Sequence, residues 1–167
     1  MTAFLSVTVF PLLMIIAGTG DALSMRIPNW LTLLIAALFL PMALLTGMPW
    51  DMIGVHALVG IAMFVAGFVM FSLGLFGGGD AKLLAAAGLW FGWPDLMPFL
   101  VMTAFAGGIL AVAVGLWAAI SFASEIKDGS IFRNLGSIRP DVPYGYAFAI
   151  GAILTFPQSW WMPAAGS

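Results

Sequence analysis

The sequence predicts an all-α protein, a polytopic membrane bundle of about six transmembrane helices. Two observations support this fold class: 63% of the 167 residues are hydrophobic, and only 7% are charged. Soluble domains are usually about one-quarter charged, so this chain has too few charges to cover a surface that faces water. Its apolar segments are long enough for helices and lack the alternation typical of outer-membrane strands. We expect residues 1–167 to form one integral membrane domain.

Charge and cysteine content exclude several other classes of protein. The net charge is −2 and the chain has no basic tract, so we expect no nucleic-acid partner. The absence of cysteine excludes disulfides and a thiolate zinc site. We expect no cofactor, and membrane lipid is the partner that the composition implies.

The first three predicted spans are separated by short polar or glycine-containing turns. The first span covers about residues 4–20 and contains Pro11, which neighbouring helices can accommodate in a membrane. A polar stretch at 21–29 follows it. The second span covers about 30–46, and the third covers about 52–75.

The last three spans differ in length. The fourth begins at Asp80, after three glycines, and stops near 93–95. It is short for a crossing, which needs about 20 residues. The fifth span covers about 98–122. A short sixth span, about 144–156, leads to paired tryptophans at 160–161, which suit a membrane interface.

The basic residues predict the orientation in the membrane. With six spans, all five fall on one side of the membrane: Arg26 in the first loop, Lys82 just after the third span, and Lys127, Arg133 and Arg139 in the fifth loop. Cytoplasmic loops are enriched in Lys and Arg, so these loops are expected in the cytoplasm and both chain ends outside. Without the short fourth span, the basic residues would divide between the two sides.

This topology brings two carboxylates to the cytoplasmic face, where Asp21 ends the first span and Asp80 begins the fourth. A carboxylate beside or within a membrane segment is costly, which makes it a candidate functional residue. Two carboxylates at one depth could share a water: one takes its proton as it attacks a carbonyl, and the other protonates the departing group. The helix dipole favours negative charge at Asp80 and disfavours it at Asp21. We therefore expect Asp80 to be the resting base and Asp21 the resting acid.

Three motifs resemble those of a known family. Gly77-Gly78-Gly79-Asp80 fits the Gly-x-Gly-Asp signature of intramembrane aspartyl proteases. Asp21 followed by Arg26-Ile27-Pro28-Asn29 resembles the first aspartate motif of type IV prepilin peptidases. Pro143-Tyr144-Gly145 is similar to a further feature of that family, and the resemblance covers nearly the whole chain.

The resemblance implies a single aspartyl protease domain that removes the short, basic leader from prepilins or pseudopilins at the cytoplasmic face of the bacterial inner membrane. Asp21 and Asp80 would be its catalytic pair. The size of the chain resembles the short branch that serves tight-adherence (Flp) pili. Larger members carry an added cytoplasmic segment with paired cysteines and also methylate the new N-terminus, which is not expected of this cysteine-free chain. Six further residues would bind substrate or shape the site: Gly77, Gly79, Arg26, Lys82, Pro143 and Gly145.

The same residues have other interpretations. Asp80 could be a helix N-cap, and Asp21 could be an interfacial residue that ends a span. Arg26 and Lys82 are expected to determine topology and could also pair with an acidic substrate residue. His56, toward the outer end of the third span, is expected to be structural. For the whole chain, the alternatives are a small proton- or cation-coupled transporter and a non-catalytic pilus assembly subunit.

Overall fold

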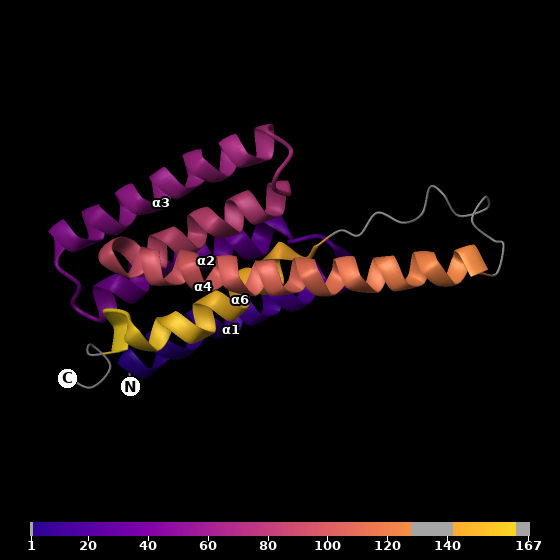
Figure 1. Cartoon of the computed structure of the whole chain (residues 1–167). Helices are drawn as coiled ribbons and strands as arrows, with labels where there is room; N and C mark the ends of the chain where they lie inside the picture. The colour runs from indigo at the N-terminus through magenta and orange to yellow at the C-terminus, as the bar shows by residue number, and fades with distance from the viewer. Residues whose placement is uncertain (1, 128–141, 163–167) are drawn as a thin grey trace.

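The computed structural model describes residues 2–127 and 142–162, and every regular element in these ranges is helical (Figure 1). The elements are α1 (Thr2–Ser24), α2 (Asn29–Leu45), α3 (Trp50–Ser72), α4 (Gly78–Lys127), α6 (Tyr144–Thr155) and the short 3₁₀ helix η1 (Phe156–Gln158). The predicted all-α bundle is confirmed.

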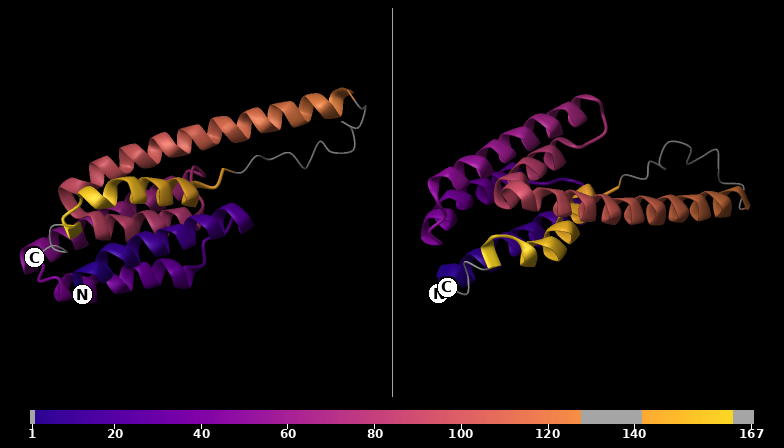
Figure 2. Two further views of the ribbon diagram at one scale, coloured as in Figure 1. Left: turned by 90° about the horizontal axis from the view of Figure 1, so that it is seen from below. Right: turned by 60° about the vertical axis from the view of Figure 1, so that its left-hand side comes forward.

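Helix α4 consists of two helical arms joined by a sharp break. Gly92 has φ 59° and ψ −161°, and Trp93 has φ −111° and ψ 129°. The first arm, 78–91, and the second arm, 94–127, fold back on each other as a hairpin (Figures 1 and 2). The arms correspond to the fourth and fifth predicted spans. The interruption expected near 93–95 needs only two residues, because glycine at position 92 adopts the positive φ that reverses the chain.

Consecutive helices alternate in direction, so their connections fall at opposite ends of the bundle (Figure 1). The α1–α2 and α3–α4 connections lie at one end, and the second arm of α4 runs toward it. We call this the Asp end, because Asp21 and Asp80 lie there. The α2–α3 connection, the break in α4 and the end of α6 lie at the opposite end.

The described basic residues belong to the Asp end. Arg26 lies in the α1–α2 connection, and Lys82 lies in the second turn of α4. Lys127 ends the arm that points the same way. Arg133 and Arg139 lie outside the described residues.

The outer surface of the bundle is apolar. Two helical segments are long and apolar enough to cross a membrane, Trp50–Ser72 and Asp95–Phe122, and two shorter helices are also apolar, Thr8–Ser24 and Asn29–Leu45. Large side chains stand exposed on these helices, as Leu58 does at 67%. Contiguous apolar surface of this extent is unfavourable in water, and lipid would cover it without that cost.

The second arm of α4 projects beyond the bundle at the Asp end (Figure 2). It is covered by α6 as far as Gly107, where an added Cβ would lie 3.6 Å from the Cβ of Ala147. The stretch 108–122 then continues as an apolar helix, with Ile109 70% and Trp117 69% exposed. No other helix among residues 2–127 and 142–162 covers this stretch, which we call the uncovered stretch; at 1.5 Å per residue it is about 22 Å long.

An aromatic cluster fills the end of the bundle opposite the aspartates. Phe10 stacks on Trp90 with ring centroids 4.9 Å apart, and Trp161 also lies 4.9 Å from Trp90. Trp90 Nε1 donates to the carbonyl of Ile35 at 2.8 Å, and Trp161 Nε1 donates to the carbonyl of Trp90 at 2.7 Å. Trp161 is fully buried because its ring completes this cluster, so its side chain faces the interior of the bundle.

Candidate active site

Asp21 lies in the last turn of α1, since the helix continues to Ser24 and does not end at Gly20 as expected. Its side chain is only 6% exposed. Its Oδ2 accepts a hydrogen bond of 2.8 Å from the backbone N–H of Gly145. Gly145 lies in the first turn of α6, where backbone N–H groups lack partners within the helix and can bind an anion. A backbone N–H of α6 thus fixes the position of the Asp21 carboxylate in α1.

The contact between α1 and α6 depends on small residues. A Cβ added at Gly145 would lie 2.8 Å from Asp21 Cβ and 2.9 Å from Asp21 Oδ2. One turn earlier in α1, a Cβ added at Gly18 would lie 2.7 Å from the Cβ of Ala149. Pro143 directly precedes α6, and its carbonyl accepts the N–H of Tyr146 at 3.1 Å, which starts the helix.

Asp80 is the third residue of α4 and is 8% exposed. Its Oδ2 accepts a 3.2 Å hydrogen bond from the N–H of Gly77, the residue before the helix. This is one half of a capping box, so Asp80 caps α4 from within its first turn and is not the N-cap residue itself. Its Oδ1 is buried and has no hydrogen-bond partner in the described part of the chain.

The α1–α2 connection packs against the start of α4. Ile27 is buried, and a Cβ added at Gly79 would lie 3.0 Å from the Cβ of Ile27. Met25 has a φ of 50°, a left-handed conformation that usually falls to glycine at a helix end, and its N–H donates to the carbonyl of Asp21 at 2.7 Å. This turn directs the chain from the end of α1 toward α4.

These elements form a pocket of about 570 Å³ at the Asp end. Both aspartates line it, together with residues 24–29 and 77–79. Among the residues that the sequence singles out, Gly77, Gly79 and Arg26 line the pocket, and Arg26 is exposed. Gly145 is not part of the pocket lining, but its backbone N–H donates to Asp21, which is. Lys82 and Pro143 do not line it, and Lys82 donates instead to Asn29 Oδ1 at 2.8 Å.

Sequence reasoning did not single out several lining residues for a role at the site. Ser24, Met25 and Ile27 contribute to the wall beside Asp21. The sequence could have indicated that Ile27 is buried, because it is an apolar residue directly before a proline in a polar stretch. Met25 had none, because its left-handed backbone is not typical of methionine.

His56 lies outside the pocket, with Nδ1 2.8 Å from the carbonyl of Leu89 and its ring stacked 5.5 Å from Phe39, which gives it a packing role. Among residues 2–127 and 142–162, no three His, Cys, Asp or Glu side chains gather as a possible metal-ligand set.

Comparison with known proteins matches the chain to a family. The model of the type IV leader peptidase family matches residues 8–112, a range that contains both aspartates and all of the pocket lining. No curated protein and no solved structure matches significantly. Because the match extends over more than half of the sequence, the chain belongs to the type IV leader peptidase family.

Proposed function

We propose that this chain is a membrane-embedded aspartyl endopeptidase, a single domain that removes the leader peptide of type IV prepilins at the cytoplasmic face of the bacterial inner membrane. Family membership supplies the peptidase class. The observation that carries the proposal is the shared pocket, where nearly buried carboxylates from α1 and α4 lie together. As the substrates we propose prepilins of the tight-adherence (Flp) type.

The surroundings of the two carboxylates favour chemistry over a structural role. Buried carboxylates in proteins are usually paired with cations or bound to metals. Asp21 and Asp80 each accept one backbone N–H group, and neither forms an ion pair within the described residues. Two like charges on nearly buried side chains in one pocket repel each other, so the pair is suited to hold a single proton between its members.

Such a pair can hydrolyse a peptide bond. The ionised carboxylate takes a proton from water as the water oxygen attacks the scissile carbonyl carbon. The protonated carboxyl then gives its proton to the leaving nitrogen as the C–N bond breaks, so the pair again holds one proton. The helix dipole favours Asp80 as the base, whereas the shorter backbone hydrogen bond favours ionised Asp21. Because these two effects oppose each other, we assign the single proton to the pair as a whole and not to one of the two aspartates.

Replacing each carboxylate by an amide tests the proposal. Asp21→Asn and Asp80→Asn keep the side-chain shape but cannot take or give the proton, so each should slow leader removal by about 10²- to 10⁴-fold. The measurement is the mass of an Flp-type prepilin after incubation with purified protein. Asp51→Asn is the control, because Asp51 is exposed in the first turn of α3, at the opposite end of the bundle.

The outcomes separate the candidate functions. Wild-type cleavage by both Asn variants would overturn the aspartyl mechanism. An uncut prepilin with the wild-type protein, together with proton- or cation-coupled uptake into vesicles, would favour the transporter.

A further inference from the structure

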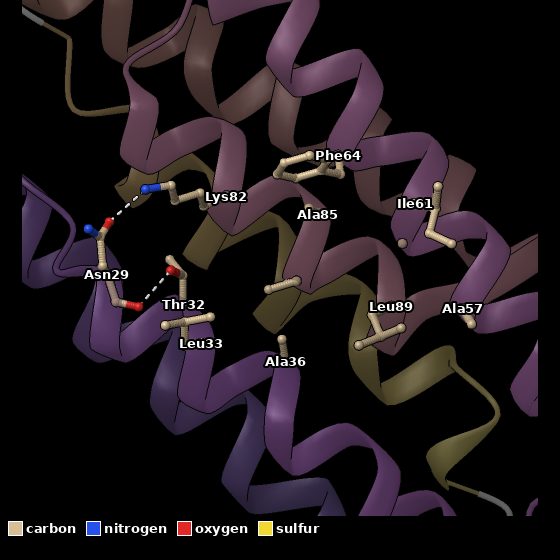
Figure 3. A pocket seen from close by; sticks show the side chains of 12 residues that line it. Asn29, Thr32, Leu33, Ala36, Ala57, Ile61, Phe64, Lys82, Ala85 and Leu89 are labelled. Carbon is tan, nitrogen blue, oxygen red and sulfur yellow. Dashed lines mark hydrogen bonds between the residues drawn. The ribbon is translucent and has the colours of Figure 1, made fainter.

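A second concavity lies between α2 and α3, with the first arm of α4 as its floor (Figure 3). We call it the lateral groove, and its volume is about 560 Å³. Its lining comes from 29–36 in α2, 57–64 in α3 and 82–89 in α4. Each stretch covers about two helical turns, so the groove is about 10 Å long.

The lateral groove has small residues inside and large apolar residues at its rim. Ala36, Ala57 and Ala85 line it, one from each helix (Figure 3). Leu33 and Ile61 stand at its edges and are 68% and 60% exposed, so the groove opens toward the outside of the bundle. Small residues let a further helix approach closely within a membrane.

One end of the lateral groove is polar and shares a lining residue with the candidate active site. Lys82 Nζ donates to Asn29 Oδ1 at 2.8 Å, and Thr32 Oγ1 donates to the carbonyl of Asn29 at 3.0 Å (Figure 3). Asn29 also lines the pocket that contains Asp21 and Asp80. The groove and the pocket therefore lie next to the same residue, Asn29.

We propose that the lateral groove docks about two turns of an apolar helix of the substrate, and that the substrate chain passes from this helix over Asn29 into the carboxylate pocket. The inference rests on the proposed function. A peptide segment at membrane depth must satisfy its backbone hydrogen bonds internally, which a helix does. A lipid tail would contact the apolar walls but could not form hydrogen bonds with the polar end near Asn29. A peptide substrate could contact both the walls and the polar end, and it must also reach the two carboxylates.

Phenylalanine in the groove tests the docking. Ala36→Phe and Ala57→Phe place a ring on facing walls, and both positions are half-buried. For a precursor that retains its apolar helix, each should raise KM by about tenfold or more, because overpacking an apolar contact is costly. A short peptide with only the cleavage site should be cut at the wild-type rate. Ala37→Phe and Ala62→Phe are the matched controls, because they lie on exposed faces of the same two helices outside the groove.

The comparison of two substrates separates this inference from the function on which it rests. If the wild type cuts neither substrate, the peptidase proposal fails. If the wild type cuts both and the groove variants match their controls, the docking proposal alone fails. Equal losses on both substrates would also overturn docking, because the lateral groove serves only the helix-bearing precursor.

Crosslinking provides a readout that does not depend on cleavage. A photoreactive residue at Ile61, in the Asp80→Asn background that should keep the precursor intact, is expected to capture the apolar helix of the precursor. The same residue at Leu58, which is exposed on α3 outside the groove, is the control. Capture of lipid alone at Ile61 would overturn the proposal.

Discussion

The hydrogen bond from the Gly145 N–H to Asp21 joins α6 to α1 at a position where a side chain would not fit. A Cβ at position 145 would lie 2.8 Å from Asp21 Cβ, so Gly145→Ala must push the carboxylate or the start of α6 aside. Misplacing a catalytic group by about 1 Å can cost about 10²-fold in rate. We expect a loss of that size in kcat for prepilin cleavage.

The control for this prediction lies beside the catalytic residue. A Cβ added at Gly20 meets nothing within 4 Å, and alanine is favoured over glycine in a helix, so Gly20→Ala should keep its activity. Wild-type kcat in Gly145→Ala would show that the close contact with Asp21 is not needed for catalysis.

At the residue scale, the sequence predicted which aspartates to examine, but not how each is held. Asp21 and Asp80 stand out because charge is rare in this chain. The partner of Asp21 lies 124 positions away, and no local pattern reports a contact over that distance. Resemblance placed Gly145 near the site, and only the structure connects its N–H to a carboxylate.

The two-armed form of α4 depends on one glycine. Gly92 has positive φ, and a Cβ there would collide with the ring of His56, which packs beneath the break. Gly92→Ala combines an unfavourable left-handed backbone with overpacking, so it should lower the free energy of unfolding by about 2 kcal/mol or more. Thermal unfolding of the purified protein in detergent measures the effect as a lower Tm.

A second glycine of α4 serves as the reference. A Cβ at Gly115 meets nothing within 4 Å, and its φ is not in the positive range, so Gly115→Ala should leave the Tm unchanged or raise it slightly. An unchanged Tm in Gly92→Ala would contradict the strain assigned to the break.

At the element scale, the sequence predicted the number and order of helices better than their ends. The fourth span was expected to stop near Trp93-Pro94-Asp95, and the break lies at Gly92 and Trp93. Glycine and proline mark a boundary in the sequence, but not which residue adopts positive φ or that the His56 ring lies against the break. α1 extends past its predicted end for a similar reason, because contacts with α6 support its last turns.

The alternation of helices predicts which connections share a side of the membrane. The chain has no cysteine, so single-cysteine variants report position without background. Ser24→Cys and Ser72→Cys should react with an impermeant maleimide only from the cytoplasmic side, because both lie at the Asp end. Thr46→Cys and Asp51→Cys should react only from the outside. Labelling of Ser24→Cys and Asp51→Cys from the same side would contradict this orientation.

At the scale of the whole molecule, composition was enough for the fold class, because so few charges leave no alternative to an apolar exterior. The aromatic cluster and the lateral groove were not predictable. Phe10, Trp90 and Trp161 come from distant parts of the chain, and the groove exists only where three helices diverge.

The uncovered stretch of the second α4 arm bears on where hydrolysis would take place. This apolar rod reaches about 22 Å past the level at which α6 begins, beside Asp21. Acyl chains that cover the rod would extend past the level of the two aspartates, toward the cytoplasm. The peptide would then be cut in a recess on the cytoplasmic side of the bilayer, which stays open to cytoplasmic water along a flank of the bundle that the rod does not close.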